Sequence, residues 1–257
     1  AAPTTSYSNT GLSPSTSYSY TVAAYDAAGN LSDQSNMAIA TTAPGGTGQI
    51  KFPNLSVIMP SGAIAVVQTP TGRQFQYTND TFNGGPGPLV IQPVLNLASG
   101  AYEGTQLVYA QSNSGVWSLA QSIPVAGAFV FHAAHGHFHF PFLSFGLYTD
   151  ANGSPGAPVA ISGKIGFCIN DSFMYAPTLP NAGALGNLGP CTDPTSLRGL
   201  NIGAADEYDK TDEGQSISID NLADGTYWLR AVVDPDNYLA ESDKNNNETD
   251  VKLTISG

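Results

Sequence analysis

Short apolar runs with a two-residue period recur along most of the chain, separated by turns rich in glycine and proline. In TSYSYTVAAYD (residues 16–26), alternate positions from Tyr18 to Ala24 are apolar or aromatic, which is the period of a β-strand. Similar reasoning predicts strands in residues 74–82, 87–97, 115–119, 127–140, 157–169, 215–220, 225–234 and 249–255. No helical period is evident. The pattern therefore predicts an all-β, sandwich-like fold with a long irregular stretch at residues 176–206.

Composition divides the chain into three segments. Residues 1–42 are rich in Ser, Thr and Ala, residues 43–48 are expected to be a flexible linker, and residues 49–257 are expected to form one domain. With 28 Gly, 18 Pro and a hydrophobic content of 41%, the chain has enough apolar residues for a core built from short strands. This composition excludes a disordered protein.

The first segment carries a partial match to a known module. GLSPSTSYSYTVAAYDAAGNLS (residues 11–32) resembles about the last three strands of a fibronectin type III module, with Leu12, Pro14 and Tyr18 at the corner before its sixth strand. Half a module leaves an apolar face and an open strand edge. We therefore expect the segment either to come from a longer chain that starts upstream of Ala1, or to be completed by the next domain or by a partner chain.

The net charge of −12 limits the partners of the protein. Nucleic acid is excluded as a partner, because phosphate binding needs lysine and arginine. An acidic surface favours cationic partners, although it is equally typical of an acidic secreted protein without any electrostatic role. No apolar stretch is long enough to span a membrane. The two cysteines, Cys168 and Cys191, fit either one disulfide in an oxidising compartment or two buried thiols.

All four histidines lie in HAAHGHFHF (residues 132–140). In a continuous strand, His135, His137 and His139 would share one face and His132 would point to the other. Three neutral imidazoles on one face suit Cu²⁺, Ni²⁺ or Zn²⁺. The alternative is an aromatic core strand with packed histidines, which would need a hydrogen-bond partner for each imidazole. We favour a metal site, walled by the phenylalanines at positions 131, 138, 140 and 142.

Three stretches in order resemble one family. They are FHAAHGHFH (residues 131–139), GKIGFCIND (residues 163–171) and the segment from Gly199 to Asn247, which contains GLNIGAADEYDKTD. The chain from about residue 49 onwards resembles the catalytic domain of the lysyl oxidases, the copper- and quinone-dependent amine oxidases. The resemblance implies a sandwich-like catalytic domain with long irregular loops.

The resemblance also assigns chemical roles. It implies that His135, His137 and His139 bind copper, with His132 on the family's upstream histidine, and that Lys164 and Tyr208 join to form lysine tyrosylquinone. Copper and O₂ would oxidise the tyrosine ring to a quinone, to which the lysine amine adds, and the cofactor would oxidise primary amines. Without the resemblance, a solvated strand lysine and a loop tyrosine would be the simpler interpretations.

Several positions depart from the animal enzymes of this family. Phe129 and Phe131 replace tryptophans, and Ala134 replaces a cysteine, which removes one family disulfide. The resemblance implies that Cys168 and Cys191, left without their family partners, pair with each other.

The general base is also left open. HFPFLSFGLYTD (residues 139–150) lacks the acidic residues and the histidine that follow the copper strand in the animal enzymes. Asp206, Asp209 and Asp212 could supply a carboxylate near Tyr208, but we expect them to be surface acids.

A second metal site is suggested by ESDKNNN (residues 241–247), where oxygen-bearing side chains gather at a density that suits Ca²⁺. The resemblance implies a structural calcium site completed by residues near the start of the domain. The candidate ligands are Glu241, Asp243, Asn246, Asn247, Asn54 and Leu55. An ordinary polar turn is the alternative.

The best functional interpretation is an extracellular copper amine oxidase, acting on lysine side chains of extracellular proteins or on small amines. The alternative is a structural or adhesive module of an extracellular assembly, which keeps its metal for stability and has lost the oxidase chemistry. A zinc hydrolase is weaker, because no Glu or Asp lies within the histidine motif to act as a base.

Overall fold

The structure is a computed structural model of the 257-residue chain. It describes residues 9, 12, 15–26, 28–42, 48–60, 62–96, 99–132, 137–163, 166–186, 188–189 and 192–256. Within these ranges, the side chains of residues 127, 128, 132, 137, 139, 166 and 167 also lie outside the description. The described ranges contain strands and turns, so the predicted all-β class is confirmed. No helix in them is long and apolar enough to cross a membrane.

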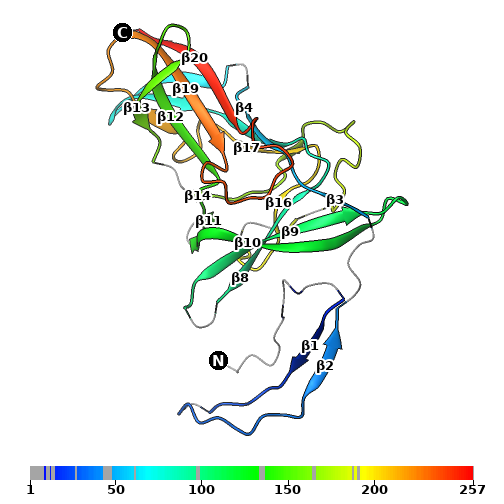
Figure 1. Cartoon of the computed structure of the whole chain (residues 1–257). Coiled ribbons are helices and arrows are strands. Elements are labelled where there is room, and N and C mark those ends of the chain that lie inside the picture. The colour runs from blue at the N-terminus through cyan, green and yellow to red at the C-terminus, as the bar shows by residue number, and fades with distance from the viewer. Residues whose placement is uncertain are drawn as a thin grey trace.

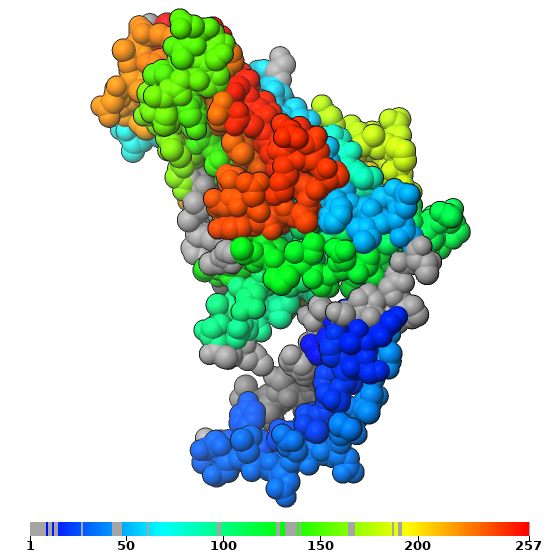
Figure 2. Space-filling model, viewed as in Figure 1, coloured from blue at the N-terminus to red at the C-terminus, as the bar shows by residue number. Residues whose placement is uncertain are grey.

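The N-terminal segment forms a small hairpin. β1 (Ser17–Tyr20) pairs antiparallel with β2 (Ala38–Thr41). The predicted strand over residues 16–26 is therefore shorter than expected, and its continuation makes only a single bridge, from Tyr25 to Leu31. Figures 1 and 2 show this hairpin at one end of the molecule, away from the C-terminal strands. Residues 43–47 of the expected linker lie outside the described residues.

The largest sheet joins segments from most of the chain in the order β14-β11-β10-β9-β8-β16, with β3 also paired to β9. The long strands β9 (Tyr102–Gln111) and β10 (Trp117–His132) form its centre. The other members are β3 (Gln49–Lys51), β8 (Leu89–Leu95), β11 (His137–His139), β14 (Gly166–Phe167) and β16 (Arg198–Leu200).

Three smaller sheets complete the domain (Figure 1). One has the order β13-β12-β19-β20, from β12 (Leu143–Asp150), β13 (Pro155–Ile161), β19 (Gly225–Val233) and β20 (Glu248–Ile255). A second has the order β15-β17-β7-β4, from β4 (Leu55–Ile58), β7 (Asn79–Asn83), β15 (Phe173–Met174) and β17 (Ala204–Tyr208). The third has the order β18-β6-β5, from β5 (Ile64–Thr69), β6 (Gly72–Tyr77) and β18 (Ser216–Ser218).

One main core lies between these sheets. The alternating positions of β12 and β19 contribute buried residues such as Phe145 and Leu229, which are at most 2% exposed. The ring of Tyr77 of β6 packs against Phe145 in a tilted arrangement, with ring centroids 4.5 Å apart. Aromatic residues around β11 continue the core, where Phe129 stacks on Phe140 at 4.4 Å. Burial of these rings drives the folding of the domain, because apolar area removed from water is the dominant favourable term.

Three predicted strands are each divided in the structure. The predicted strand at residues 157–169 ends as β13 at Ile161, and its later part contains β14, which belongs to another sheet. Residues 74–82 form β6 and β7, which belong to different sheets and are separated by Thr78. Residues 127–140 form not one strand but the end of β10 and the returning strand β11. In residues 127–140 the phenylalanines change from odd positions (129, 131) to even positions (138, 140), and this change of phase is the sequence signal of the reversal.

Candidate functional site

The histidine stretch folds back on itself as a hairpin. β10 ends at His132, which is the register partner of His137 at the start of β11. The expectation of one unbroken strand with His132 on the opposite face was therefore wrong, since the two histidines are cross-strand neighbours. His139 stands at the alternate position of β11 and pairs with Val130. His135 lies outside the described residues.

The strand β11 lies next to the lysine segment. In the antiparallel pair of β11 and β14, His139 is the partner of Gly166 and Phe138 is the partner of Phe167. The sheet thus brings two of the three family stretches together, although they lie far apart in the sequence. Lys164 and Ile165 lie outside the described residues.

The third stretch meets the second through a tyrosine hydroxyl. Tyr208, at the end of β17, donates a hydrogen bond from its hydroxyl to the carbonyl of Cys168 at 2.9 Å. The same oxygen accepts a hydrogen bond from the Cys168 amide at 2.7 Å. Cys168 follows β14 directly, so Tyr208 is fixed beside the strand that pairs with β11. As a whole residue, Tyr208 is partly exposed.

The carboxylate of Asp206 is buried on the same strand as Tyr208, with 4% of its surface exposed. The expectation that it is a surface acid was wrong. Ser172 donates a hydrogen bond to Asp206 Oδ1 at 3.0 Å. Burial raises the pKa of Asp206 well above its usual range. Burial, and then the negative charge of Asp206, raise the pKa of the Tyr208 phenol. Burial thus shifts both groups toward their protonated forms, relative to an ordinary aspartate and tyrosine.

The other two candidate acids lie in a turn after β17. Asp209 accepts hydrogen bonds from the amide and hydroxyl of Thr211, and these bonds lower the pKa of its carboxyl group. Asp212 is exposed and accepts a hydrogen bond from the Asp209 amide. These contacts are typical of turn carboxylates, as the sequence led us to expect.

Phenylalanines enclose the region around β11. Phe138, Phe140 and Phe142 are each at most 2% exposed, so the predicted apolar wall is present at these positions. The guanidinium of Arg198 lies 5.1 Å from the centroid of the Phe138 ring. Arg198 is itself buried, and burial lowers its pKa. Among the described residues, no group of three or more His, Cys, Asp or Glu side chains gathers as a metal site.

Part of the candidate calcium set comes together around Glu241. Glu241 accepts hydrogen bonds from the Leu55 amide through Oε2 and from Asn247 Nδ2 through Oε1, both at 2.8 Å. Asn54 Oδ1 and Asn247 Oδ1 are buried without a hydrogen-bond partner among the described residues. Burial, and to a smaller extent the charge of Asp234, raise the pKa of Glu241, while the hydrogen bonds from Asn247 and Leu55 and the charge of Lys244 lower it. Three oxygen-bearing side chains here thus have the chemistry that Ca²⁺ requires.

The remaining two candidate ligands lie further out. Asp243 is exposed, and its Oδ1 accepts hydrogen bonds from the amide and side chain of Asn245. Asn246 is also exposed. The loop between β19 and β20 therefore has a buried part around Glu241 and an exposed turn around Asp243.

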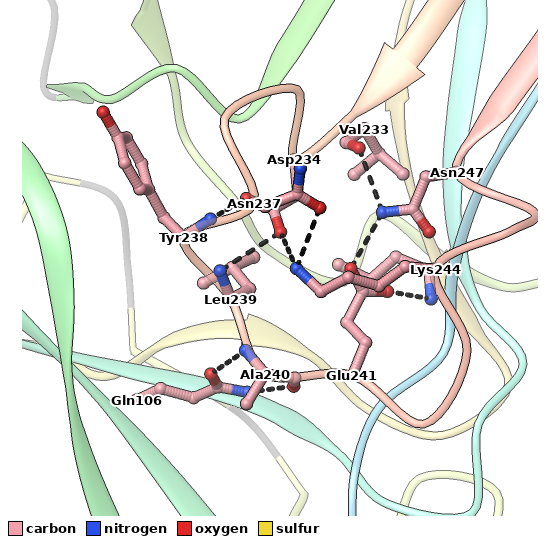
Figure 3. Close-up of polar contacts among 11 residues, drawn as sticks. Gln106, Val233, Asp234, Asn237, Tyr238, Leu239, Ala240, Glu241, Lys244 and Asn247 are labelled. Carbon is pink, nitrogen blue, oxygen red and sulfur yellow. Dashed lines mark hydrogen bonds and ion pairs between the residues drawn. The ribbon is translucent and has the colours of Figure 1, made fainter.

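Two residues that the sequence did not single out hold this loop in place (Figure 3). Asp234 is 2% exposed and accepts hydrogen bonds from the amides of Tyr238 and Leu239 and from Lys244 Nζ. Gln106 of β9 both donates to and accepts from the backbone of Ala240, at 2.8 and 2.7 Å. Gln106 lies among the mixed polar and apolar residues of β9, so no sequence signal pointed to this contact.

Cys168 is disulfide-bonded, which agrees with the oxidised state expected from the two cysteines. Cys191 lies outside the described residues. Cys168 is also the hydrogen-bonding partner of Tyr208, so the disulfide restrains the residue that holds the tyrosine hydroxyl.

The sequence profile described as lysyl oxidase matches residues 108–257, which include the histidine hairpin, the lysine segment and Tyr208. Because the match covers more than half of the chain, the chain belongs to the lysyl oxidase family.

Similar proteins in this family come from vertebrates. The chain is 30% identical over 137 residues to lysyl oxidase homolog 3B of Danio rerio, which covers 48% of this chain and 14% of that protein. It is 29% identical over 126 residues to lysyl oxidase homolog 1 of Homo sapiens, which covers 49% of this chain and 20% of that protein. The chain thus matches no more than about a fifth of the length of these relatives.

A different protein matches a short part of the chain. The alpha-amylase of Niallia circulans is 60% identical over 43 residues, which is 17% of this chain and 3% of that protein. The family match begins after the N-terminal segment, so the fibronectin type III resemblance of residues 1–42 stays a prediction.

Proposed function

We propose that the protein is a secreted copper-dependent amine oxidase that converts primary amines to aldehydes and releases ammonia and hydrogen peroxide. Membership of the lysyl oxidase family supports amine oxidase activity in general. The observation that carries the proposal to particular residues is the pair of hydrogen bonds between Tyr208 and Cys168, beside the strand that pairs with the histidine hairpin.

Copper would be held by His135, His137 and His139, because three imidazole nitrogens are a donor set that Cu²⁺ accepts. When bound, copper with O₂ supplies the oxidising power that forms lysine tyrosylquinone and restores it after each turnover. The quinone would derive from Lys164 and Tyr208. Four residues of chain span at most about 14 Å, so the position of Cys168 limits how far Lys164 lies from the Tyr208 hydroxyl.

The surrounding residues would orient the reacting groups and limit water. Tyr208 is held through its hydroxyl, which fixes the orientation of its ring, and as a whole residue it is partly exposed, so a substrate would approach from that side. The buried rings of Phe138 and Phe140 exclude water from the side of β11. The net charge of −12 favours cationic substrates, such as lysine side chains of extracellular proteins or small amines.

A calcium ion would tie the loop after β19 to the start of the domain. Glu241, Asn247, Asn54 and the backbone of Leu55 would form its inner ligands, with Asp243 and Asn246 on the exposed side. The buried, unpartnered oxygens of Asn54 and Asn247 support this role. The calcium would be structural, since Ser242 already joins the loop to Pro53 by a hydrogen bond of 2.8 Å.

The proposal is tested by loading the protein with copper in air and measuring hydrogen peroxide release from a small primary amine and from a lysine-containing peptide. We expect turnover by the wild type and by Tyr175→Phe, an exposed tyrosine that serves as the control. We expect none by Tyr208→Phe. A wild type that binds copper and releases no peroxide would contradict the proposal and favour the alternative, a metal-stabilised structural or adhesive module.

A further inference from the structure

A group of buried polar atoms without partners lies beside Tyr208. They are both amide atoms of Asn79, the hydroxyl oxygen of Thr81 and Asp206 Oδ2, each without a hydrogen-bond partner among the described residues. Asn79 and Thr81 have no exposed surface, and Asp206 is 4% exposed. Buried polar atoms in native proteins are almost always hydrogen-bonded to protein or to ordered water.

The strand register places these atoms on the face of Tyr208. β17 pairs antiparallel with β7, with Tyr208 opposite Asn79 and Asp206 opposite Thr81. Directly opposed residues share a face of a sheet, as do residues two apart on one strand. The intervening pair, Asp80 and Glu207, points to the other face. Asn79, Thr81, Asp206 and Tyr208 therefore form one polar patch inside the protein.

The chemistry of this patch suits water. Asn79 offers donors and an acceptor, Thr81 offers a hydroxyl, and Asp206 offers a carboxylate oxygen. A buried water typically makes about three hydrogen bonds to polar groups that would otherwise be unsatisfied. Asn83, two positions further along β7, shows the contrast, because its Nδ2 donates to the carbonyls of Gly87 and Leu200.

We propose that Asn79, Thr81 and Asp206 hold buried water against Tyr208, and that Asp206 accepts the phenol proton of Tyr208 through this water when the ring is converted to the quinone. This inference rests on the proposed function of Tyr208. The Tyr208 hydroxyl first turns from the Cys168 carbonyl, to which it donates in this structure, toward the water. The phenol O–H bond then breaks as its proton passes to water, and a proton of that water forms a new O–H bond on the Asp206 carboxylate. The electrons of the ring leave to O₂, the oxidant of the proposed function.

The charged neighbours of Asp206 set the pH dependence of this step. Burial raises its pKa most, and the charge of Asp171 raises it further, while contacts with Ser172, the Asn170 backbone and Tyr208 lower it. Asp206 therefore becomes a proton acceptor at a higher pH than an ordinary aspartate. The rate of conversion should rise with pH as Asp206 loses its proton. Asp212 also faces the site and raises the pKa of Tyr208.

The water site is tested in the metal-free protein by NMR. Long-lived water is detected by magnetisation transfer between water and the side-chain amide protons of Asn79. We expect transfer at Asn79 and none at Asn83, whose amide protons are used by backbone carbonyls. If the side-chain amide of Asn79 also shows no magnetisation transfer from water, the water site is overturned.

The role of Asp206 is tested by the rate at which the Lys164 and Tyr208 peptides become cross-linked after copper is added in air. We expect Asp206→Asn to slow this rate at least tenfold and to abolish its rise with pH, and Asp206→Glu to restore part of both. Glu207→Gln, the outward-facing neighbour, should behave as the wild type. Copper content and circular dichroism check that each variant is folded and loaded.

The outcomes separate this role from the proposed function. Wild-type rate and pH dependence in Asp206→Asn would overturn the role of Asp206 and leave the proposed function intact. A wild type that binds copper but forms no cross-link would overturn both the proposed function and the proton-accepting role. The water site is then still decided by the metal-free NMR measurement.

Discussion

The phenol oxygen of Tyr208 lies between the backbone amide and the backbone carbonyl of Cys168, 2.7 Å from the nitrogen and 2.9 Å from the oxygen. This contact spans 40 positions of the sequence and joins the sheet of β17 to the sheet of β14. It fixes the tyrosine that we propose as a cofactor precursor next to the segment that carries the proposed lysine.

Removal of this hydroxyl is expected to destabilise the protein even without metal. Tyr208→Phe keeps the ring but removes both hydrogen bonds between the hydroxyl and the Cys168 backbone, which should lower the free energy of unfolding by about 1–3 kcal/mol. Urea denaturation of the metal-free protein measures the change. Tyr175→Phe, at an exposed ring, should change stability by less than about 0.5 kcal/mol. Equal stability of Tyr208→Phe and the wild type would show that the contact is weak in solution.

Asp234 is expected to be important for the loop between β19 and β20. Asp234→Ala leaves the amides of Tyr238 and Leu239 without their acceptor and breaks the 2.9 Å ion pair with Lys244. We expect a loss of about 2–4 kcal/mol in the free energy of unfolding. Asp236→Ala, on the exposed part of the same loop, is the control and should have little effect. A similar loss in both variants would contradict a specific role for Asp234.

Asp80 is expected to make the protein less stable as pH rises. Burial, and then the charge of Glu207, raise the pKa of Asp80 to about 6. Between pH about 4 and 6 the unfolded chain has lost this proton while the folded protein keeps it, so rising pH favours unfolding. Asp80→Asn removes this effect. With allowance for screening of the charge by solvent, the substitution should be more favourable at pH 7 than at pH 3.5 by about 1–2 kcal/mol in the free energy of unfolding.

Unfolding by urea at several pH values measures this difference. Asp33→Asn, at an exposed position, is the control and should leave the pH dependence unchanged. The same pH dependence in Asp80→Asn as in the wild type would show that Asp80 titrates at its ordinary value.

Calcium is expected to stabilise the metal-free protein through Glu241. A ligand at 100 times its dissociation constant adds about 2.7 kcal/mol to the stability of the folded state. Thermal unfolding with and without added Ca²⁺ should therefore show an upward shift in Tm, which chelation reverses. Glu241→Gln should lose the shift, and Glu213→Gln, an exposed acid elsewhere, should keep it. A shift that survives in Glu241→Gln would place any calcium at another site.

The sequence was sufficient for the class of fold because strand periodicity survives even where strands are short. The hairpin at the histidines was missed because residues on both sides of the turn alternate. The phenylalanines change from odd positions (129, 131) to even positions (138, 140) across it, and the pairing of His132 with His137 shows the reversal. Likewise, residues 74–82 divide at Thr78 between two sheets, a division that depends on tertiary contacts.

The candidate site was predictable to a different extent. The order of the three family stretches allowed Tyr208 to be selected, and the structure places it beside the lysine segment. The burial of Asp206 and the orphaned polar atoms of Asn79 were missed, because a short run of polar residues in a strand resembles a solvent-exposed edge. Their burial follows from the way β15, β17 and β7 pack, which no local pattern encodes.

The most direct test of the account is a peptide mass map of the protein after copper loading in air. We predict one cross-linked species that contains the peptides of Lys164 and Tyr208, and its loss in Tyr208→Phe. Separate and unmodified peptides from a protein that has bound copper would contradict the account, and the domain would then be a metal-stabilised structural module.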